Sequence, residues 1–156
     1  MTVTGRVSVI IPTYNRATVI GETLASLAAV DWRDVEVIIA DDGSTDDTSA
    51  IIARLREQGY RWPVIYFWQE NSGPAAARNA GHERMSGEFV YHLDSDDTVC
   101  PDAFAQLIAE IERSGAPYAI GQVTDAIVTS REEQSTGITN HQILPGDVLF
   151  STWYTH

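Results

Sequence analysis

The chain has 156 residues, of which 44 % are hydrophobic, and it carries a formal net charge of −12. This length and hydrophobic content are sufficient for one folded domain and argue against a disordered chain. All ten basic residues are arginines. The absence of lysine excludes a lysine Schiff base and a P-loop, and the acidic charge disfavours a nucleic-acid partner.

No apolar run reaches the length of a membrane-spanning helix, and the first residues do not follow the plan of a signal peptide. The single cysteine, Cys100, cannot form a disulfide within the chain. We therefore expect a cytoplasmic protein with no transmembrane segment in this chain.

Apolar runs alternate with segments of helical periodicity along the first 115 residues. In chain order, the sequence predicts a strand at 7–12, a helix at 17–29, a strand at 35–40, a helix that Gly59 ends, a strand at 64–68, a helix at 75–85, a strand at 88–93 and a helix from Pro101 to Gly115. This β–α alternation predicts an α/β fold with a mostly parallel central sheet and helices on both faces, as in Rossmann-like proteins.

The pattern is weaker after residue 118. Residues 118–129 have room for one or two strands, residues 130–142 are polar and loop-like, and residues 143–150 are apolar again.

The fourth predicted strand ends in an acidic cluster, Asp94-Ser95-Asp96-Asp97. Carboxylates this close repel one another where water is partly excluded, and a hard divalent cation such as Mg²⁺ or Mn²⁺ relieves the repulsion. An EF-hand is excluded, because Val99 and Ala105 stand where that loop needs glycine and glutamate. The cluster thus favours a metal site, with an acid–base carboxylate pair and a solvated acidic turn as the alternatives.

Polar residues also follow the first two strands and begin the third helix, where open α/β sheets bind ligands. Tyr14 can stack on a base and Arg16 can approach a phosphate; the alternative is a loop with a surface arginine. Asp42 can accept a hydrogen bond from a base or ribose, whereas Ser44 suits the start of the next helix. Arg78 can reach a diphosphate or form a structural ion pair with the acidic cluster.

Four segments in this order resemble the nucleotide-sugar-binding part of a family 2 glycosyltransferase with the GT-A fold. They are Val7 to Arg16, Val35 to Asp46, Asn71 to Gly81 and Leu93 to Asp102. Each segment is weakly specific alone, and their common order and spacing make the resemblance specific. It covers about residues 5–115.

The resemblance implies a role for several of these residues. Pro12, Tyr14 and Asp42 would hold the nucleobase, commonly uracil, with Arg16 and Arg78 near the ribose and the diphosphate.

The acidic cluster occupies the position of the family's Asp-x-Asp motif, with Asp94 and Asp96 in the nucleotide-sugar site. Asp96 would lie between the ribose and a Mg²⁺ or Mn²⁺ ion, and Asp97 would be the second metal ligand. The ion would stabilise the diphosphate as leaving group. A hydroxyl of a saccharide, lipid or other acceptor would then attack with inversion.

The resemblance further implies one GT-A domain over 1–156, with the nucleotide-sugar-binding part at 5–115 and an incomplete start of the acceptor side at 116–156. The family's catalytic base is an aspartate or glutamate further downstream in an acidic pair. Four acidic residues after the cluster lack that context: Asp125, Glu132, Glu133 and Asp147. We therefore expect a fragment of a longer enzyme and assign no catalytic base.

Two other functions are considered. A sugar nucleotidyltransferase of related architecture would show a glycine-rich phosphate loop with a lysine after the first strand, where this chain has Pro-Thr-Tyr-Asn-Arg. A non-catalytic fragment that binds a nucleotide-sugar or a partner protein is the second alternative.

Overall fold

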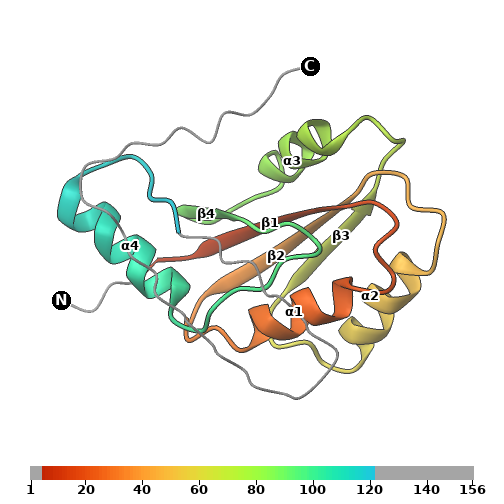
Figure 1. Cartoon of the computed structure of the whole chain (residues 1–156), viewed down its shortest axis with the longest axis horizontal. Helices are drawn as coiled ribbons and strands as arrows, with labels where there is room; N and C mark the ends of the chain where they lie inside the picture. The colour runs from red at the N-terminus through yellow and green to blue at the C-terminus, as the bar shows by residue number, and fades with distance from the viewer. Residues whose placement is uncertain (1–4, 122–156) are drawn as a thin grey trace, which may run out of the picture. The chain divides into compact units, whose positions relative to one another are not determined.

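The computed structural model describes residues 5–121, and within them four parallel strands form a sheet in the order β3-β2-β1-β4 (Figure 1). The expected α/β fold with a mostly parallel sheet is confirmed. The strands are β1 (Val7–Thr13), β2 (Val35–Asp41), β3 (Val64–Trp68) and β4 (Phe89–His92). The helices are α1 (Ile20–Ala28), α2 (Thr48–Glu57), α3 (Pro74–His82) and α4 (Ala103–Ser114).

The two central strands, β1 and β2, are buried along their whole length, which explains their nearly continuous apolar sequence. Their pairing runs from Val7 opposite Val35 to Thr13 opposite Asp41, so both strands end together. The residues that follow them are therefore delivered to one edge of the sheet, at the carboxyl ends of the strands.

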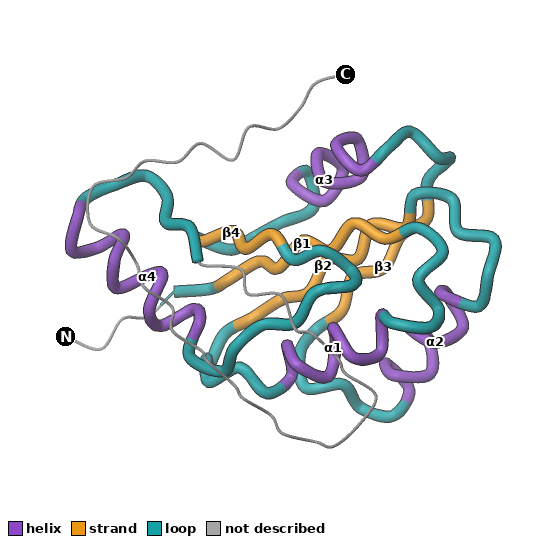
Figure 2. The backbone as a smooth tube through the Cα atoms, viewed as in Figure 1, coloured by secondary structure: helices purple, strands orange, loops and turns teal. Residues whose placement is uncertain are grey.

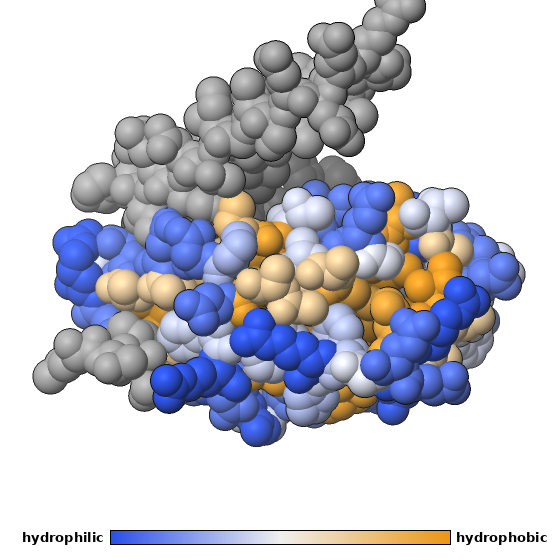
Figure 3. Space-filling model, turned by 90° about the horizontal axis from the view of Figure 1, so that it is seen from below, coloured by the Kyte–Doolittle hydropathy of each residue, from blue (hydrophilic) through white to orange (hydrophobic). Residues whose placement is uncertain are grey.

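Helices cover both faces of the sheet, with α1 and α2 on one side and α3 on the other (Figure 2). Helix α1 buries Ile20, Leu24 and Leu27. Viewed from below, the surface shows hydrophilic residues with hydrophobic ones among them (Figure 3). Helix α3 approaches the sheet closely at Gly81, where an added Cβ would lie 2.6 Å from Cγ2 of Ile10.

The amino ends of β1 and β2 are joined through the buried side chain of Glu36. Its Oε1 accepts hydrogen bonds from Ser8 Oγ at 2.6 Å and from the backbone N–H of Ser86 at 2.6 Å. Burial alone would raise the pKa of Glu36, but these hydrogen bonds and the charge of Arg6 outweigh it and hold the pKa below its usual range. The network fastens the start of the sheet to the segment that precedes β4.

Helix α1 begins at Ile20, three residues later than the periodicity predicts. The backbone N–H groups of Asn15 and Ala17 donate to side chains of the β2–α2 loop, and that of Arg16 donates to Thr48, the first residue of α2. Asn15 also has a φ of 51°, which is incompatible with a right-handed helix. Residues 17–19 form a turn between this loop and α1, in which the Arg16 carbonyl accepts the N–H groups of Val19 and Ile20.

The sheet and α1–α3 belong to one compact unit that ends at Ala105, and a second unit begins at Gln106. The expectations for residues 122–150, including the four downstream acidic residues, lie outside the described part of the chain. Residues 118–121 have no regular secondary structure. Within residues 5–121, none of the helices combines the length and the apolar character that a membrane span requires.

Candidate functional site

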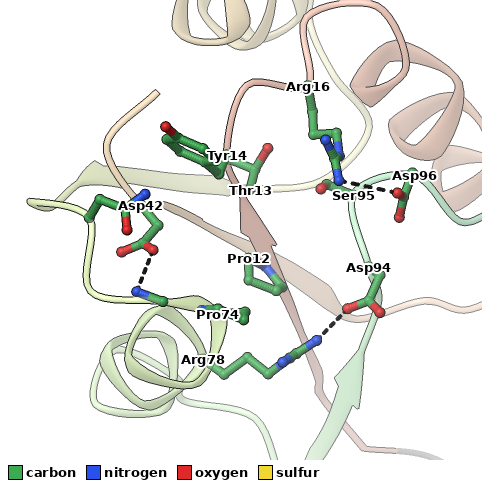
Figure 4. A pocket seen from close by; sticks show the side chains of 12 residues that line it. Pro12, Thr13, Tyr14, Arg16, Asp42, Pro74, Arg78, Asp94, Ser95 and Asp96 are labelled. Atoms are coloured by element: carbon green, nitrogen blue, oxygen red, sulfur yellow. Dashed lines mark hydrogen bonds and ion pairs between the residues drawn. The ribbon is translucent and has the colours of Figure 1, made fainter. Parts of the chain in front are cut away.

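A pocket of about 430 Å³ lies at the carboxyl edge of the sheet, between the loops after β1, β2 and β4 and the start of α3 (Figure 4). This volume is typical of small-molecule sites. The lining residues are Pro12, Thr13, Tyr14, Arg16, Asp42, Asn71, Gly73, Pro74, Arg78, Asp94, Ser95 and Asp96. They include all seven residues that the sequence nominates for the nucleotide-sugar, whereas the nominated metal ligand Asp97 is not among them.

The end of β1 contributes a buried residue and an exposed aromatic one. Pro12 is buried within the strand, and Tyr14, just past the end of β1, is 47 % exposed. An exposed aromatic ring at a pocket edge offers a face for stacking against a planar group. The position of Tyr14 therefore suits the base-stacking role that the sequence suggests.

Asp42 lies just past β2, and its carboxylate accepts three N–H groups from the loop that precedes α3. Oδ1 accepts from Gln69 Nε2 at 2.7 Å and from the backbone N–H of Ser72 at 2.9 Å. Oδ2 accepts from the backbone N–H of Gly73 at 2.7 Å. A carboxylate has about four acceptor positions on its two oxygens, and the hydrogen bonds found among residues 5–121 occupy three of them.

The neighbouring residue, Asp41, forms hydrogen bonds within the protein. Asp41 Oδ1 accepts the backbone N–H of Ser44, and Oδ2 accepts the hydroxyl of Tyr66, both at 2.7 Å. Burial and then the hydrogen bond to Asp41 raise the pKa of Tyr66. The two consecutive aspartates thus divide their contacts: Asp41 braces the sheet edge, and Asp42 lines the pocket.

Two arginines form ion pairs with the acidic cluster. Arg78 NH2 lies 2.5 Å from Asp94 Oδ1, and the Arg78 side chain is only 15 % exposed. Arg16 NH2 lies 3.5 Å from Asp96 Oδ2 in a more open position. The ion pair of Arg78 with the acidic cluster, one of the two roles suggested by the sequence, is therefore present. Arg78 and its partner Asp94 both line the pocket.

Asp97 is the last carboxylate of the acidic cluster and follows Asp96 directly. Burial, followed by the negative charges of Asp94 and Asp96, raises the pKa of Asp97. In residues 5–121, no three or more histidine, cysteine, aspartate or glutamate side chains are arranged to hold a metal ion. Carboxylate oxygens nevertheless suit a hard divalent cation, and Mg²⁺ commonly uses one or two protein carboxylates together with substrate phosphates. The residues present fit an ion of that kind.

Five lining residues were not nominated from the sequence, although they all lie within the segments that carry the resemblance: Thr13, Asn71, Gly73, Pro74 and Ser95. Ser95 is buried, and its carbonyl accepts the hydroxyl of Thr23 in α1 at 2.9 Å, which fixes the acidic loop. The contact of Gln69 with Asp42 was also missed. Nothing in the sequence signals it, because the two residues meet only after β2 and β3 have paired.

Comparison with known proteins gives a family match. The family model "Glycosyl transferase family 2" matches residues 8–150. The chain is 35 % identical over 121 residues to "Glycosyltransferase GlyA" of Streptococcus pneumoniae serotype 4, covering 78 % of this chain and 17 % of that protein. It is 36 % identical over 105 residues to "GalNAc(5)-diNAcBac-PP-undecaprenol beta-1,3-glucosyltransferase" of Campylobacter jejuni, covering 66 % of this chain and 33 % of that protein.

Solved structures with the same arrangement include two nucleotide-sugar complexes. One is S. aureus TarS 1–349 in complex with UDP-GlcNAc, at a TM-score of 0.63 and 35 % identity, covering 69 % of this chain and 31 % of TarS. The other is the mannosyltransferase PcManGT from Pyrobaculum calidifontis in complex with GDP-Man and Mn²⁺, at a TM-score of 0.68 and 30 % identity, covering 77 % and 35 %.

The chain thus spans a third or less of the length of the two curated relatives. Its match to the family model begins in β1 and covers every strand and helix that the structure describes. With the pocket at the carboxyl edge of a parallel sheet, this match confirms the expected GT-A architecture. The chain belongs to glycosyl transferase family 2.

Proposed function

We propose that the pocket binds the nucleotide part of a UDP-sugar and that the protein transfers the sugar to a hydroxyl group of an acceptor. The carboxylate of Asp42 is the observation that carries the proposal. It lines the pocket, three N–H donors among residues 5–121 fix its orientation, and a fourth acceptor position would take a donor of the ligand. A group of this kind selects a ligand that donates a hydrogen bond.

The base class follows from this requirement. Uracil and guanine each carry a ring N–H on the edge that forms base pairs, whereas cytosine and adenine have a bare nitrogen acceptor at that position. An ionised carboxylate only accepts hydrogen bonds. The exocyclic amines of cytosine and adenine can also donate to it, but their bare ring nitrogen would then lie beside its negative charge, so Asp42 favours the first two bases. The nucleotides of the two structural relatives, UDP and GDP, both belong to this class. We take uracil as the base because the resemblance indicates it.

Arg16 and Arg78 would receive the diphosphate. Each pairs with a carboxylate of the acidic cluster, so its guanidinium is already oriented before a ligand arrives. A guanidinium binds phosphate oxygens through paired N–H donors. Tyr14 would stack on the base, and Pro12 would contact it.

Asp96 and Asp97 would hold Mg²⁺ or Mn²⁺ with the diphosphate. Burial, and after it the negative charges of Asp94 and Asp96, raise the pKa of Asp97, and a cation would relieve this crowding of charge. A divalent ion held there would supply stabilisation of the negative charge on a departing nucleoside diphosphate. The protein's own contribution would be to hold these carboxylates beside the two arginines that receive the diphosphate.

We further propose that residues 5–115 are the nucleotide-sugar-binding part of one GT-A domain and that residues 116–156 begin its acceptor side. Transfer would invert the anomeric centre, and the acceptor would be a saccharide, lipid or other hydroxyl compound. A cytoplasmic location stays a prediction. We assign no catalytic base among residues 5–121.

The test is a calorimetric titration of this chain with UDP, GDP, CDP and ADP in the presence of Mn²⁺. We expect UDP and GDP to bind more tightly than CDP and ADP, and UDP to bind much more weakly after chelation. Asp97→Ala should reproduce the effect of chelation on UDP. Thr18→Ala, which changes an exposed side chain outside the pocket lining, serves as the control.

Equal binding of all four nucleotides would overturn the role of Asp42, and equal binding of UDP with and without metal would overturn the cation site. Incubation of this chain with UDP-sugars distinguishes a glycosyltransferase from a fragment that only binds the nucleotide-sugar. Release of UDP by this chain would show catalysis, whereas saturable binding without release would favour a binding fragment.

A further inference from the structure

We propose that Asn15 is a positioning residue for the pocket: its side-chain carboxamide holds the loop of residues 14–17 in the conformation that presents Tyr14 and Arg16. This inference rests on the proposed function, because those two side chains are assigned there to the base and the diphosphate. Asn15 itself is not among the pocket-lining residues. Its effect on a ligand would therefore be indirect.

The backbone of Asn15 has a φ of 51°, the only positive φ of a non-glycine residue that the described part of the chain shows. Asparagine adopts this left-handed conformation more readily than most residues. The turn reverses the chain just after β1, so that Tyr14 and Arg16 stand on either side of it. Both side chains line the pocket.

The carboxamide oxygen of Asn15 reaches across to the loop between β2 and α2. Oδ1 accepts the backbone N–H of Thr45 at 2.8 Å and the backbone N–H of Asp46 at 3.3 Å. The hydroxyl of Thr45 lies 3.4 Å from the same oxygen. One side-chain atom of the first loop thus satisfies two backbone donors of the second.

Side chains of the β2–α2 loop and of the first residue of α2 also accept hydrogen bonds from the β1–α1 loop. Three consecutive backbone N–H groups of the β1–α1 loop each donate to a side chain near the start of α2, at 2.9–3.0 Å. The pairs are Asn15 N with Ser44 Oγ, Arg16 N with Thr48 Oγ1, and Ala17 N with Asp46 Oδ2. We call this set of residues, Asn15 to Ala17 with Ser44 to Asp46 and Thr48, the Asn15 latch.

Ser44 connects the latch to the sheet through Asp41, the last residue of β2. The backbone N–H of Ser44 donates to Asp41 Oδ1, and Asp41 Oδ2 accepts the hydroxyl of Tyr66 in β3. Hydrogen bonds therefore run without interruption from the β1–α1 loop through the β2–α2 loop to β3. The loop is thereby connected to β2 and β3 of the sheet.

Outside the latch, the contacts of this segment include the ion pair of Arg16 with Asp96 and the Arg16 carbonyl, which accepts the backbone N–H groups of Val19 and Ile20. Pairing of β1 with β2 ends at Thr13, and α1 begins only at Ile20. Tyr14 is 47 % exposed and the Arg16 side chain 44 %, so burial contributes little to holding them. A loop that is ordered before binding avoids the entropic cost of ordering it with the ligand. The latch would provide that order.

Three variants test the latch by calorimetric titration with UDP and Mn²⁺. Asn15→Gly keeps the positive φ but removes the acceptor oxygen, and we expect affinity to fall on the order of tenfold, as for one lost hydrogen bond of ordinary strength. Asn15→Asp keeps both the conformation and an acceptor oxygen, and should bind within about threefold of the unchanged protein. Thr18→Gly adds the same flexibility outside the latch and is the matched control.

Hydrogen exchange gives a readout that needs no ligand. The backbone amides of Arg16 and Ala17 should exchange slowly in the unchanged protein and in Asn15→Asp, and at least tenfold faster in Asn15→Gly. UDP affinity of Asn15→Gly equal to that of the unchanged protein would overturn the proposal. Affinity of Asn15→Asp as low as that of Asn15→Gly would also overturn it, since the acceptor oxygen would then be irrelevant.

The same experiments distinguish failure of the proposed function from failure of the Asn15 latch. If the unchanged protein binds no nucleotide, the donor assignment falls, and the exchange rates alone decide whether Asn15 orders this loop. Unaltered exchange at Arg16 and Ala17 in Asn15→Gly would then refute the latch as well.

Discussion

Asp42→Asn replaces the carboxylate at the centre of the proposed base site by an amide of nearly the same shape. The carboxylate accepts three N–H groups, two on Oδ1 and one on Oδ2. An asparagine at this position has only one oxygen. That oxygen best serves the two donors from Gln69 and Ser72, which turns the new NH₂ group toward Gly73 N–H and toward the remaining ligand position on the pocket side.

The magnitude follows from the hydrogen bonds that change. A hydrogen bond to a charged group contributes about 1.5–3 kcal/mol, so loss of the bond from the uracil N–H should weaken UDP binding about 10- to 150-fold. Leaving the Gly73 N–H unsatisfied costs about 1–3 kcal/mol of stability. In a domain of this size, each kcal/mol corresponds to a fall in Tm of about 2–4 °C.

Asp42→Asn should also change which base the pocket prefers. An NH₂ group on the pocket side can donate to the bare ring nitrogen of cytosine, which the carboxylate cannot. We therefore expect the preference for UDP over CDP, measured by calorimetry with Mn²⁺, to shrink or reverse in Asp42→Asn. An unchanged UDP affinity in a folded Asp42→Asn protein would refute the argument that Asp42 reads the base.

Three further predictions concern the packing, the pH dependence and the diphosphate site. Gly81→Ala forces a Cβ to within 2.6 Å of the buried Ile10 side chain, so thermal unfolding should show a loss of about 1–3 kcal/mol; an unchanged Tm would contradict the tight packing of α3. Because the pKa of Glu36 is lowered in the folded state, its stabilisation is complete above the ordinary glutamate pKa and is lost as the pH falls through the folded-state pKa. Urea unfolding should accordingly show Glu36→Gln less stable than the unchanged protein at pH 7, by about 1–3 kcal/mol, with a gap that narrows below about pH 4.5; a constant gap would contradict this account. Arg78→Gln removes the charge that pairs with Asp94 and should weaken UDP on the order of tenfold or more in calorimetry; equal UDP affinity would contradict the diphosphate role.

The sequence predicts the sheet well because β1 and β2 are buried on both faces and their sequences are nearly continuous apolar runs. Their parallel order then brings the residues after each strand to one edge, which is why the nominated pocket residues assemble as expected. Helix boundaries are the main errors in the described elements: α1 begins three residues later than predicted, and α3 ends at His82 and not at residue 85. Local periodicity cannot reveal that the N–H groups of Asn15 to Ala17 bond to the β2–α2 loop and to the first residue of α2.

The finer features of the site depend on contacts between distant residues. Asp42 is recognisable as a carboxylate after a strand, but the donors from Gln69, Ser72 and Gly73 come from a loop about 30 positions away. The pairing of Arg16 with Asp96 likewise joins residues that only the fold brings together. Sequence patterns identify the chemical groups, whereas the side-chain partners that orient those groups require the structure.

The central claim is that the pocket at the carboxyl edge of the sheet receives a nucleoside diphosphate. Titration of the ¹⁵N-labelled chain with UDP and Mg²⁺, followed by amide chemical shifts, tests it directly. The account predicts saturable shifts in the Tyr14–Arg16 loop, at Asp42 and Gly73, and in the acidic cluster Asp94 to Asp97. Absence of shifts at saturating UDP, or shifts confined to another surface such as Ile65 and Trp68 on β3, would contradict it.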